Sequence, residues 1–205
     1  MYAKMIFPLL MDWLLGRKFF LGARQDLLEN ARGLVVEIGF GTGLNIPHYP
    51  PGIIAIRAVD PVRLLPGRLA RRMAKAPFPV SFAFAAGEDL PFPSQHFDSA
   101  ISTFTLCTVR DPIAALREVK RVLKPGGRFL FLEHGRSDSP AIARWQDRLN
   151  PIQQVVGCGC NLNRPIDRLV KQAGLSLERL GRDHVPGTPR MLGELYRGIA
   201  SRRDD

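Results

Sequence analysis

The chain has 205 residues, of which 45% are hydrophobic and 23% are charged. This balance suits one globular domain with a single buried core, and it excludes a disordered or a fibrous chain. The formal net charge of +10 would attract polyanions such as nucleic acid or an anionic membrane surface. Three cysteines cannot all pair within one chain, which favours a reducing compartment and a cytoplasmic location.

The N-terminal segment is rich in large apolar side chains but is interrupted by Lys4, Pro8, Asp12, Arg17 and Lys18. We therefore expect neither a membrane-spanning helix nor a secretory signal here. The spacing of the apolar residues predicts an amphipathic helix or a pair of helices instead. We interpret residues 1–32 as a helical cap that packs on a main domain of residues 33–205, with peripheral contact to a membrane as the alternative.

Short apolar runs alternate with helical segments from residue 33 onward, a pattern typical of a mostly parallel sheet with helices on both faces. Strands are expected over residues 34–38, 54–59, 80–85, 97–103, 128–133, 175–180 and 195–201. Asp111 and Pro112 predict a helix start, and this helix is expected to stop at the KPGG segment; a later helix is expected over residues 163–173. Pro66 and Gly67 predict a kink or a late start in the helix after the second strand.

Basic residues gather on that same helix. Arg68, Arg71, Arg72 and Lys75 are spaced so that they share one side of it. We interpret this stripe as a solvated helix face. Nucleic-acid binding is the alternative, and it is not favoured, because the sequence shows no interleaved aromatic residues and no RNA-binding motif.

The most informative segment is a buried strand that runs directly into three glycines at alternate positions, Gly39, Gly41 and Gly43. Because glycine has no Cβ, such a loop lets a ligand contact the backbone. The third glycine comes one position too early for a dinucleotide fingerprint, which argues against NAD. Glu37 places negative charge beside the loop, which suits a cationic ligand and would repel a diphosphate.

Two further polar segments follow the second and third strands. Asp60 ends the second strand, where a carboxylate can accept hydrogen bonds from both hydroxyls of a ribose. Gly87 and Glu88 follow the third strand, where backbone N–H groups and a nearby acid suit the edge of an adenine. Together with the glycine loop, these residues predict a nucleoside site.

Taken in order, the segments EIGFGTG, AVDP, GEDLPF, FDSAIS and REVKRVLKPGG resemble the motifs of the class I methyltransferases that use S-adenosylmethionine (SAM). The resemblance covers roughly residues 33–133. It implies a Rossmann-like α/β fold with a mostly parallel seven-stranded sheet and SAM as the cofactor. Ala86 stands where many relatives carry an aspartate, so backbone contacts would recognise the adenine amino group. The cofactor-binding residues that it implies are Glu37, Gly39, Gly41, Gly43, Asp60, Pro61, Gly87, Glu88, Thr103 and Phe104.

A narrower resemblance concerns the acceptor of the methyl group. The segments STFTLCTV, FLEHGRS, WQDRLNP and GCGCNLNR are similar to those of the methyltransferase-like family whose members methylate thiols. This implies a small hydrophobic acceptor, a thiol first. A lipid acceptor such as a phospholipid amine or a quinone is the alternative, as is a non-catalytic nucleic-acid-binding module on the same fold.

His134 is the candidate catalytic acid or base, because it lies just beyond the fifth strand, where ligands bind in open α/β sheets. Its alternative role is to hydrogen-bond the segment that covers the substrate. Glu133 is expected to orient His134 or a loop, and Cys107 is expected to pack in the core. Cys158 and Cys160 have no accompanying ligands at metal-binding spacing, so no metal is predicted.

Residues 135–163 are predicted to form a lid over an apolar acceptor pocket, with help from the N-terminal helix. The apolar side chains of this segment on which the prediction rests are Trp145, Leu149, Ile152, Val155 and Val156.

Overall fold

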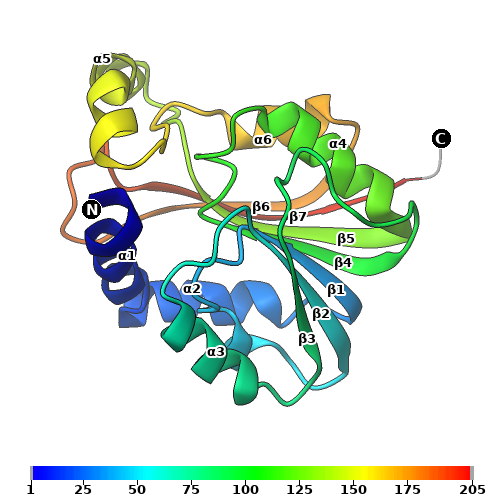
Figure 1. The fold of residues 1–205 in the computed structure, drawn as a ribbon. Helices are drawn as coiled ribbons and strands as arrows, with labels where there is room; N and C mark the ends of the chain where they lie inside the picture. Colours follow the sequence, from blue (N-terminus) through cyan, green and yellow to red (C-terminus); the bar gives the residue numbers. More distant parts are fainter. Residues whose placement is uncertain (1, 204–205) are drawn as a thin grey trace.

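The computed structural model describes residues 2–203, which form a seven-stranded sheet in the order β3-β2-β1-β4-β5-β7-β6 (Figure 1). The strands β3, β2, β1, β4 and β5 run parallel, and β7 is antiparallel to both of its neighbours. This confirms the expected α/β class with a mostly parallel seven-stranded sheet. The strands are β1 (Gly33–Ile38), β2 (Ile53–Val59), β3 (Val80–Ala83), β4 (Phe97–Thr103), β5 (Leu123–His134), β6 (Ser176–His184) and β7 (Glu194–Ser201).

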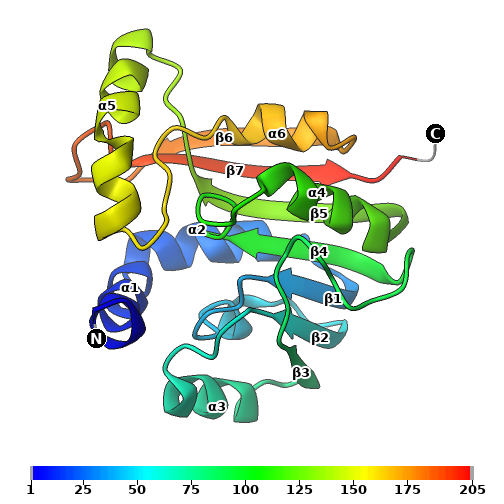
Figure 2. The ribbon, with the colours of Figure 1, turned by 45° about the horizontal axis from the view of Figure 1, so that its top comes forward.

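Helices cover both faces of the sheet (Figures 1 and 2). One face carries α2 (Lys18–Leu28) and α3 (Pro66–Ala74), and the other carries α4 (Pro112–Val122) and α6 (Ile166–Gln172). Each layer buries its own apolar cluster against the sheet, and burial of this surface is the main force that holds the layers together.

Two helices lie at the end of the sheet where the parallel strands β1, β2, β4 and β5 finish (Figure 1). They are α1 (Phe7–Leu15), which follows a π-helical turn at Tyr2–Ile6, and α5 (Pro140–Val156). A short 3-10 helix, η2 (Ile46–His48), follows the first strand at the same end. The described N-terminal residues therefore form a pair of helices, and no helix within residues 2–203 is both long and apolar enough to cross a bilayer.

The start signals of two helices behave as the sequence predicts. Asp111 caps α4, because its Oδ1 accepts hydrogen bonds from the backbone N–H groups of Ile113 and Ala114, both at 3.0 Å. Pro66 is the first residue of α3, so the interruption marks a late helix start. Leu65, just before it, has φ 45° and turns the chain into the helix.

Several predicted boundaries are wrong. The third strand ends at Ala83 rather than 85, and the last helix begins at Ile166 rather than 163, because Pro165 has a non-helical backbone. The helix capped by Asp111 ends at Val122, before the KPGG segment. Leu123 already pairs with Phe97, so Lys-Pro-Gly-Gly lies at an irregular start of β5.

Candidate active site

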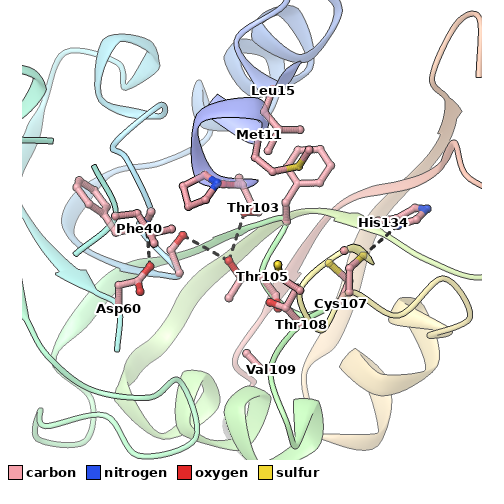
Figure 3. Close-up of a pocket in the computed structure, with 18 of the residues that line it drawn as sticks. Met11, Leu15, Phe40, Asp60, Thr103, Thr105, Cys107, Thr108, Val109 and His134 are labelled. Atoms are coloured by element: carbon pink, nitrogen blue, oxygen red, sulfur yellow. Dashed lines mark hydrogen bonds between the residues drawn. The ribbon is translucent and has the colours of Figure 1, made fainter. Parts of the chain in front are cut away.

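One cavity of about 1140 Å³ opens where the parallel strands end, beneath α1. Pockets for one small ligand usually measure about 300–1,000 Å³, so this cavity has room for two reactants side by side. Figure 3 shows Phe40 and Asp60 at one end and Cys107 and His134 at the other. The cavity brings together most of the predicted site residues, namely Glu37, Gly39, Gly41, Asp60, Pro61, Gly87, Glu88, Thr103, Phe104 and His134.

The glycine loop and Asp60 form a single hydrogen-bonded unit. Asp60 Oδ2 accepts a hydrogen bond from Gly41 N at 2.9 Å, and Oδ1 accepts one from Val62 N at 3.0 Å. Each oxygen keeps a second lone pair, which is what recognition of two neighbouring hydroxyls requires. Gly41 has φ 57°, and a Cβ built there would meet no described atom nearer than 4.0 Å, so its backbone lines open space. Burial raises the pKa of Asp60, while its two backbone hydrogen bonds oppose that rise.

Gly43 does not line the cavity within the described structure, contrary to the expectation from the sequence. Its φ of 77° favours glycine, but a Cβ there would lie 3.1 Å from Ile46 Cδ1 and 3.5 Å from Leu69 Cδ1. Gly43 therefore faces the apolar core under α3, and it shapes the turn rather than a ligand surface.

Glu37 lies at the floor of the cavity, but both carboxylate oxygens already have partners. Tyr49 donates to Oε2 at 2.6 Å and Asn45 Nδ2 donates to Oε1 at 2.8 Å. Burial raises the pKa of Glu37 to about 7, although these two hydrogen bonds oppose the rise. Burial therefore works against the negative charge predicted for this position, and the side chain also fixes the loop that follows the glycines through Asn45 and Tyr49.

Glu88 joins two loops at the Asp60 end of the cavity. Its Oε1 accepts hydrogen bonds from the backbone N–H groups of Arg110 at 3.0 Å and Asp111 at 3.2 Å. Gly87 and Ala86, beside it, line the cavity through backbone and small side-chain atoms. Backbone N–H and C=O groups are therefore available to hydrogen-bond the edge of a flat ligand. This agrees with the expectation from Ala86, which has no polar side chain for that contact.

The loop after β4 is held by Glu133, which is fully buried. Its carboxylate accepts hydrogen bonds from Ser102 Oγ at 2.6 Å and from Thr105 N at 3.0 and 3.1 Å. Thr103 and Phe104, on this loop, line the cavity, and Phe104 has φ 56°. Glu133 thus orients a loop, one of its two expected roles, and burial raises its pKa to about 7.

Arg24, which was not expected from the sequence, is a buried cation at the cavity wall. Only 2% of its surface is exposed, and its closest polar partner is the neutral Asn45 Oδ1 at 3.4 Å. Its Nε has no hydrogen-bond partner among residues 2–203. Burial lowers the pKa of Arg24 to about 10, although the charge of Glu37 opposes this. A buried guanidinium with an unsatisfied donor has the charge and the hydrogen-bonding capacity to pair with an anion such as a carboxylate.

Asp12 fastens α1 over the cavity. Its buried carboxylate accepts hydrogen bonds from Thr42 Oγ1 at 2.5 Å, Arg68 at 2.5 Å and Arg72 at 2.6 Å. Burial by itself would raise the pKa of Asp12, but the hydrogen bonds from Arg72, Thr42 and Arg68 lower it to about 2. The basic stripe on α3 is therefore not a purely solvated face. Two of its four members, Arg68 and Arg72, are paired with Asp12.

The opposite end of the cavity contains sulfur. Cys107, Cys158, Cys160 and His134 all line it, and His134 Nδ1 lies 3.5 Å from Cys160 Sγ (Figure 3). The expected packing of Cys107 in the core is met in part, since it is 2% exposed yet faces this cavity. His134 thus lies at the site and also holds the 158–160 segment, as both of its expected roles require.

The prediction of which side chains of residues 135–163 cover the cavity is largely wrong. Of the five apolar residues expected to cover the acceptor pocket, only Val156 lines the cavity in the described structure. Trp145, Ile152 and Val155 are 51%, 63% and 78% exposed, because this side of α5 turns away from the sheet. The expected help of the N-terminal helix is confirmed, since α1 contributes Met11 among others to the apolar cover, together with segments preceding and within β7.

The fold and the site together define a methyltransferase. A family model described as "Methyltransferase domain" matches residues 36–131. The same fold occurs in the N-methyltransferase NodS from Bradyrhizobium japonicum in complex with S-adenosyl-L-homocysteine, with a TM-score of 0.70 and 15% identity over 94% of this chain and 92% of that one. A geranyl diphosphate methyltransferase in complex with SAM gives a TM-score of 0.66 at 16% identity, covering 89% of this chain and 84% of the other.

Curated relatives match more closely in sequence. Thiol S-methyltransferase TMT1A from Homo sapiens is 34% identical over 83% of this chain and 71% of its own length. Thiol S-methyltransferase TMT1B from Rattus norvegicus is 32% identical over 84% of this chain and 76% of its own length. The chain therefore belongs to the class I methyltransferases, and it uses SAM as its methyl donor.

Proposed function

We propose that this enzyme transfers the SAM methyl group to the sulfur of a small apolar thiol. The observation that carries the proposal is a single cavity whose two ends differ in chemistry. One end holds the glycine loop, Asp60 and Arg24, and the other holds cysteines, apolar side chains and the imidazole of His134. The names of the relatives TMT1A and TMT1B support the choice of acceptor.

At the donor end, a different protein group is available for each part of SAM. Asp60 offers acceptor lone pairs for the ribose hydroxyls, and Gly41 gives its backbone an open approach. The unsatisfied guanidinium of Arg24 suits the carboxylate of the methionine part. Bound SAM supplies a methyl group that is already activated by its sulfonium charge. What remains for the protein is to hold an acceptor in line and to exclude water.

The acceptor end suits a thiol because it is apolar and has a base within it. Leu15 and Leu195 lie on its wall with Val156, and they favour a small hydrophobic molecule. A thiol has a pKa of about 8.5, so only a few per cent is thiolate at neutral pH. We assign His134 as the group that takes the acceptor proton, since the thiolate is the nucleophile.

The direct test is to incubate the purified protein with labelled SAM and a series of alkyl and aryl thiols, with matched alcohols, phenols and amines as controls. Label in the thioether product, and little in the controls, supports the proposal. Transfer to an amine or a phenol with none to any thiol overturns it.

The role of His134 has its own test in the variant His134→Gln. We expect the thiol methylation rate near pH 7 to fall by about 10²-fold, the usual contribution of a general base. The loss should shrink above about pH 8.5, where the thiol ionises without help. A rate loss that is constant across pH would contradict proton transfer to His134.

A second candidate acceptor is a lipid taken from a membrane surface, and one observation favours it. The α1–α5 rim beside the cavity exposes Trp13, Ile152 and Val155, and Tyr2 Oη donates to Val156 O at 2.8 Å across it. Exposed aromatic and branched side chains in a chain of net charge +10 suit peripheral contact with anionic lipid. Flotation with anionic vesicles at low salt tests this contact. Protein that stays in the dense bottom fraction, away from the vesicles, argues against it.

A further inference from the structure

Cys107 and Cys160 lie side by side on the cavity wall, although they are far apart in the sequence. Asn161, next to Cys160, donates to Cys107 O from its backbone N at 2.8 Å and from Nδ2 at 2.9 Å. The chain next to Cys160 is thus directly hydrogen-bonded to the Cys107 backbone, and both cysteines line the same cavity. A disulfide joins cysteines whose Cα atoms lie about 4.4–6.8 Å apart, and backbone hydrogen bonding at the neighbouring residue brings the two segments that close.

The turn that carries Cys160 is constrained. Cys158 has φ 48° and Gly159 has φ 97°, and a left-handed conformation is uncommon for a residue with a Cβ. Asn161 Oδ1 accepts from Gln154 Nε2 at 2.7 Å, which ties the turn to α5. Strain of this kind persists only where surrounding contacts enforce it, and here they hold the Cys160 sulfur at the cavity.

Cys160 also has the surroundings of a reactive thiol. The hydrogen bond from Cys107 holds the pKa of Cys160 well below the usual thiol value, against burial, and the contact with His134 adds to this. His134 Nε2 is buried and has no hydrogen-bond partner among residues 2–203. The polar contact of the imidazole among residues 2–203 is therefore the one from Nδ1 to Cys160 Sγ at 3.5 Å, which places an imidazole directly beside this thiol. Cys158, in the same turn, has its pKa raised by burial and serves as an internal comparison.

We propose that Cys160 is an oxidation site for hydroperoxides, and that it closes on Cys107 as a disulfide across the acceptor end of the cavity. In the first step the Cys160 thiolate attacks one peroxide oxygen, the O–O bond breaks, and a sulfenic acid and hydroxide (or an alcohol) form. In the second step Cys107 sulfur attacks the sulfenic sulfur, the S–O bond breaks, and water leaves with the Cys107 proton. The two thiols are oxidised by two electrons, and the peroxide is reduced by two.

The consequence for turnover rests on the proposed function. A disulfide would take away the Cys160 contact of His134 and stiffen the wall where the acceptor binds. Asp60 and the glycine loop, at the far end, would be unaffected. Oxidation should therefore abolish thiol methylation while SAM binding persists, and a thiol reductant should restore activity.

The experiment treats the full chain with hydrogen peroxide in the absence of acceptor, alkylates the remaining thiols, and maps the peptides without reduction. We expect a Cys107–Cys160 cross-link, lighter than the dithiol form by two hydrogens, with Cys158 alkylated. Cys158→Ser should form the same cross-link. Cys107→Ser should stop at a sulfenic acid on Cys160, detected with a diketone probe, and Cys160→Ser should give neither product.

Preferential oxidation of Cys158, or a Cys160 that stays alkylatable after peroxide treatment, overturns the proposal. Because the cross-link is read on the protein itself, this result does not depend on which acceptor the enzyme uses. Failure of the thiol assay with a normal cross-link would count against the proposed acceptor alone. Calorimetry with SAM on the oxidised protein completes the test, and a loss of SAM binding would show that the disulfide distorts more than the acceptor end.

Discussion

Arg24 gives the sharpest test of the donor site, because its replacement should move two properties in opposite directions. Arg24→Met keeps the length of the side chain and its apolar contacts but removes the charge. The guanidinium is buried, lies 5.4 Å from the ring centroid of Phe104, and has no ion-pair partner among residues 2–203. The Arg24 guanidinium should therefore destabilise the protein without ligand and stabilise its complex with SAM.

The magnitudes follow from the structure. Burial lowers the pKa of Arg24 from 12.5 to about 10, which corresponds to a penalty on the charged form of roughly 3 kcal/mol. Loss of the contact with Phe104 offsets about 1 kcal/mol of that. The variant without ligand should thus be as stable as the parent, or more stable by about 1–2 kcal/mol. Removing one partner of a buried charge pair usually costs about 2 kcal/mol or more, so the Kd for SAM should rise by roughly thirtyfold or more.

Thermal unfolding and calorimetry, each with and without SAM, measure both effects on the same samples. We expect an unchanged or higher Tm for the free variant and a much smaller rise in Tm when SAM is added. Arg71→Met, on the outer part of α3, is the matched control and should leave SAM binding unchanged. A variant that binds SAM as tightly as the parent refutes the assignment, and so does one whose free form unfolds many degrees earlier.

Three further changes test the rest of the site. Asp60→Ala should raise the Kd for SAM about tenfold to hundredfold in calorimetry, since it removes the ribose acceptor and frees Gly41 N, and equal affinity would exclude the ribose role. Asp12→Asn should lower stability by about 2 kcal/mol and Tm by roughly 4–8 °C, whereas the exposed Asp26→Asn should have little effect. Glu133 has its pKa raised by burial to about 7, so the folded state holds a proton that the unfolded state releases above about pH 4.5. The parent should lose stability as pH rises from about 4.5 to 7, and Glu133→Gln should reduce that slope in pH-dependent unfolding without removing it, because burial raises the pKa of Glu37 to about 7 as well.

The parts of the fold and site that the sequence predicts correctly are those fixed by local chemistry. The alternating apolar runs locate all seven strands to within a few residues, and Asp111 and Pro66 mark helix starts by their capping and φ preferences. The glycine loop and Asp60 meet at the cavity as expected, because they follow two adjacent parallel strands, and Asp60 accepts a hydrogen bond from Gly41 N there. These signals lie within short segments, so no tertiary information is needed to read them.

What the sequence did not reveal depends on which face of a segment turns inward. The apolar residues of α5 predicted a lid, yet Trp145 and Val155 are exposed, because α5 stands beyond the end of the sheet and this side of it faces solvent. Arg24 was missed because nothing in its own helix distinguishes it from the other arginines. Gly41 and Gly43 lie at equivalent alternate positions of the loop, so the sequence does not distinguish them. Gly43 faces the core because Leu69 of α3 packs close to it.

Asp12 shows how the two ends of the cavity depend on one element. It binds Thr42 in the glycine loop, while Tyr2 on the preceding turn donates to Val156 at the end of α5. The first helices therefore touch the donor loop at one point and the acceptor rim at another. Arg68 and Arg72 are needed to keep the Asp12 carboxylate charged where burial alone would favour its neutral form. The basic side of α3 is thus explained in part by Arg68 and Arg72, which hold α1 in place over the cavity through Asp12.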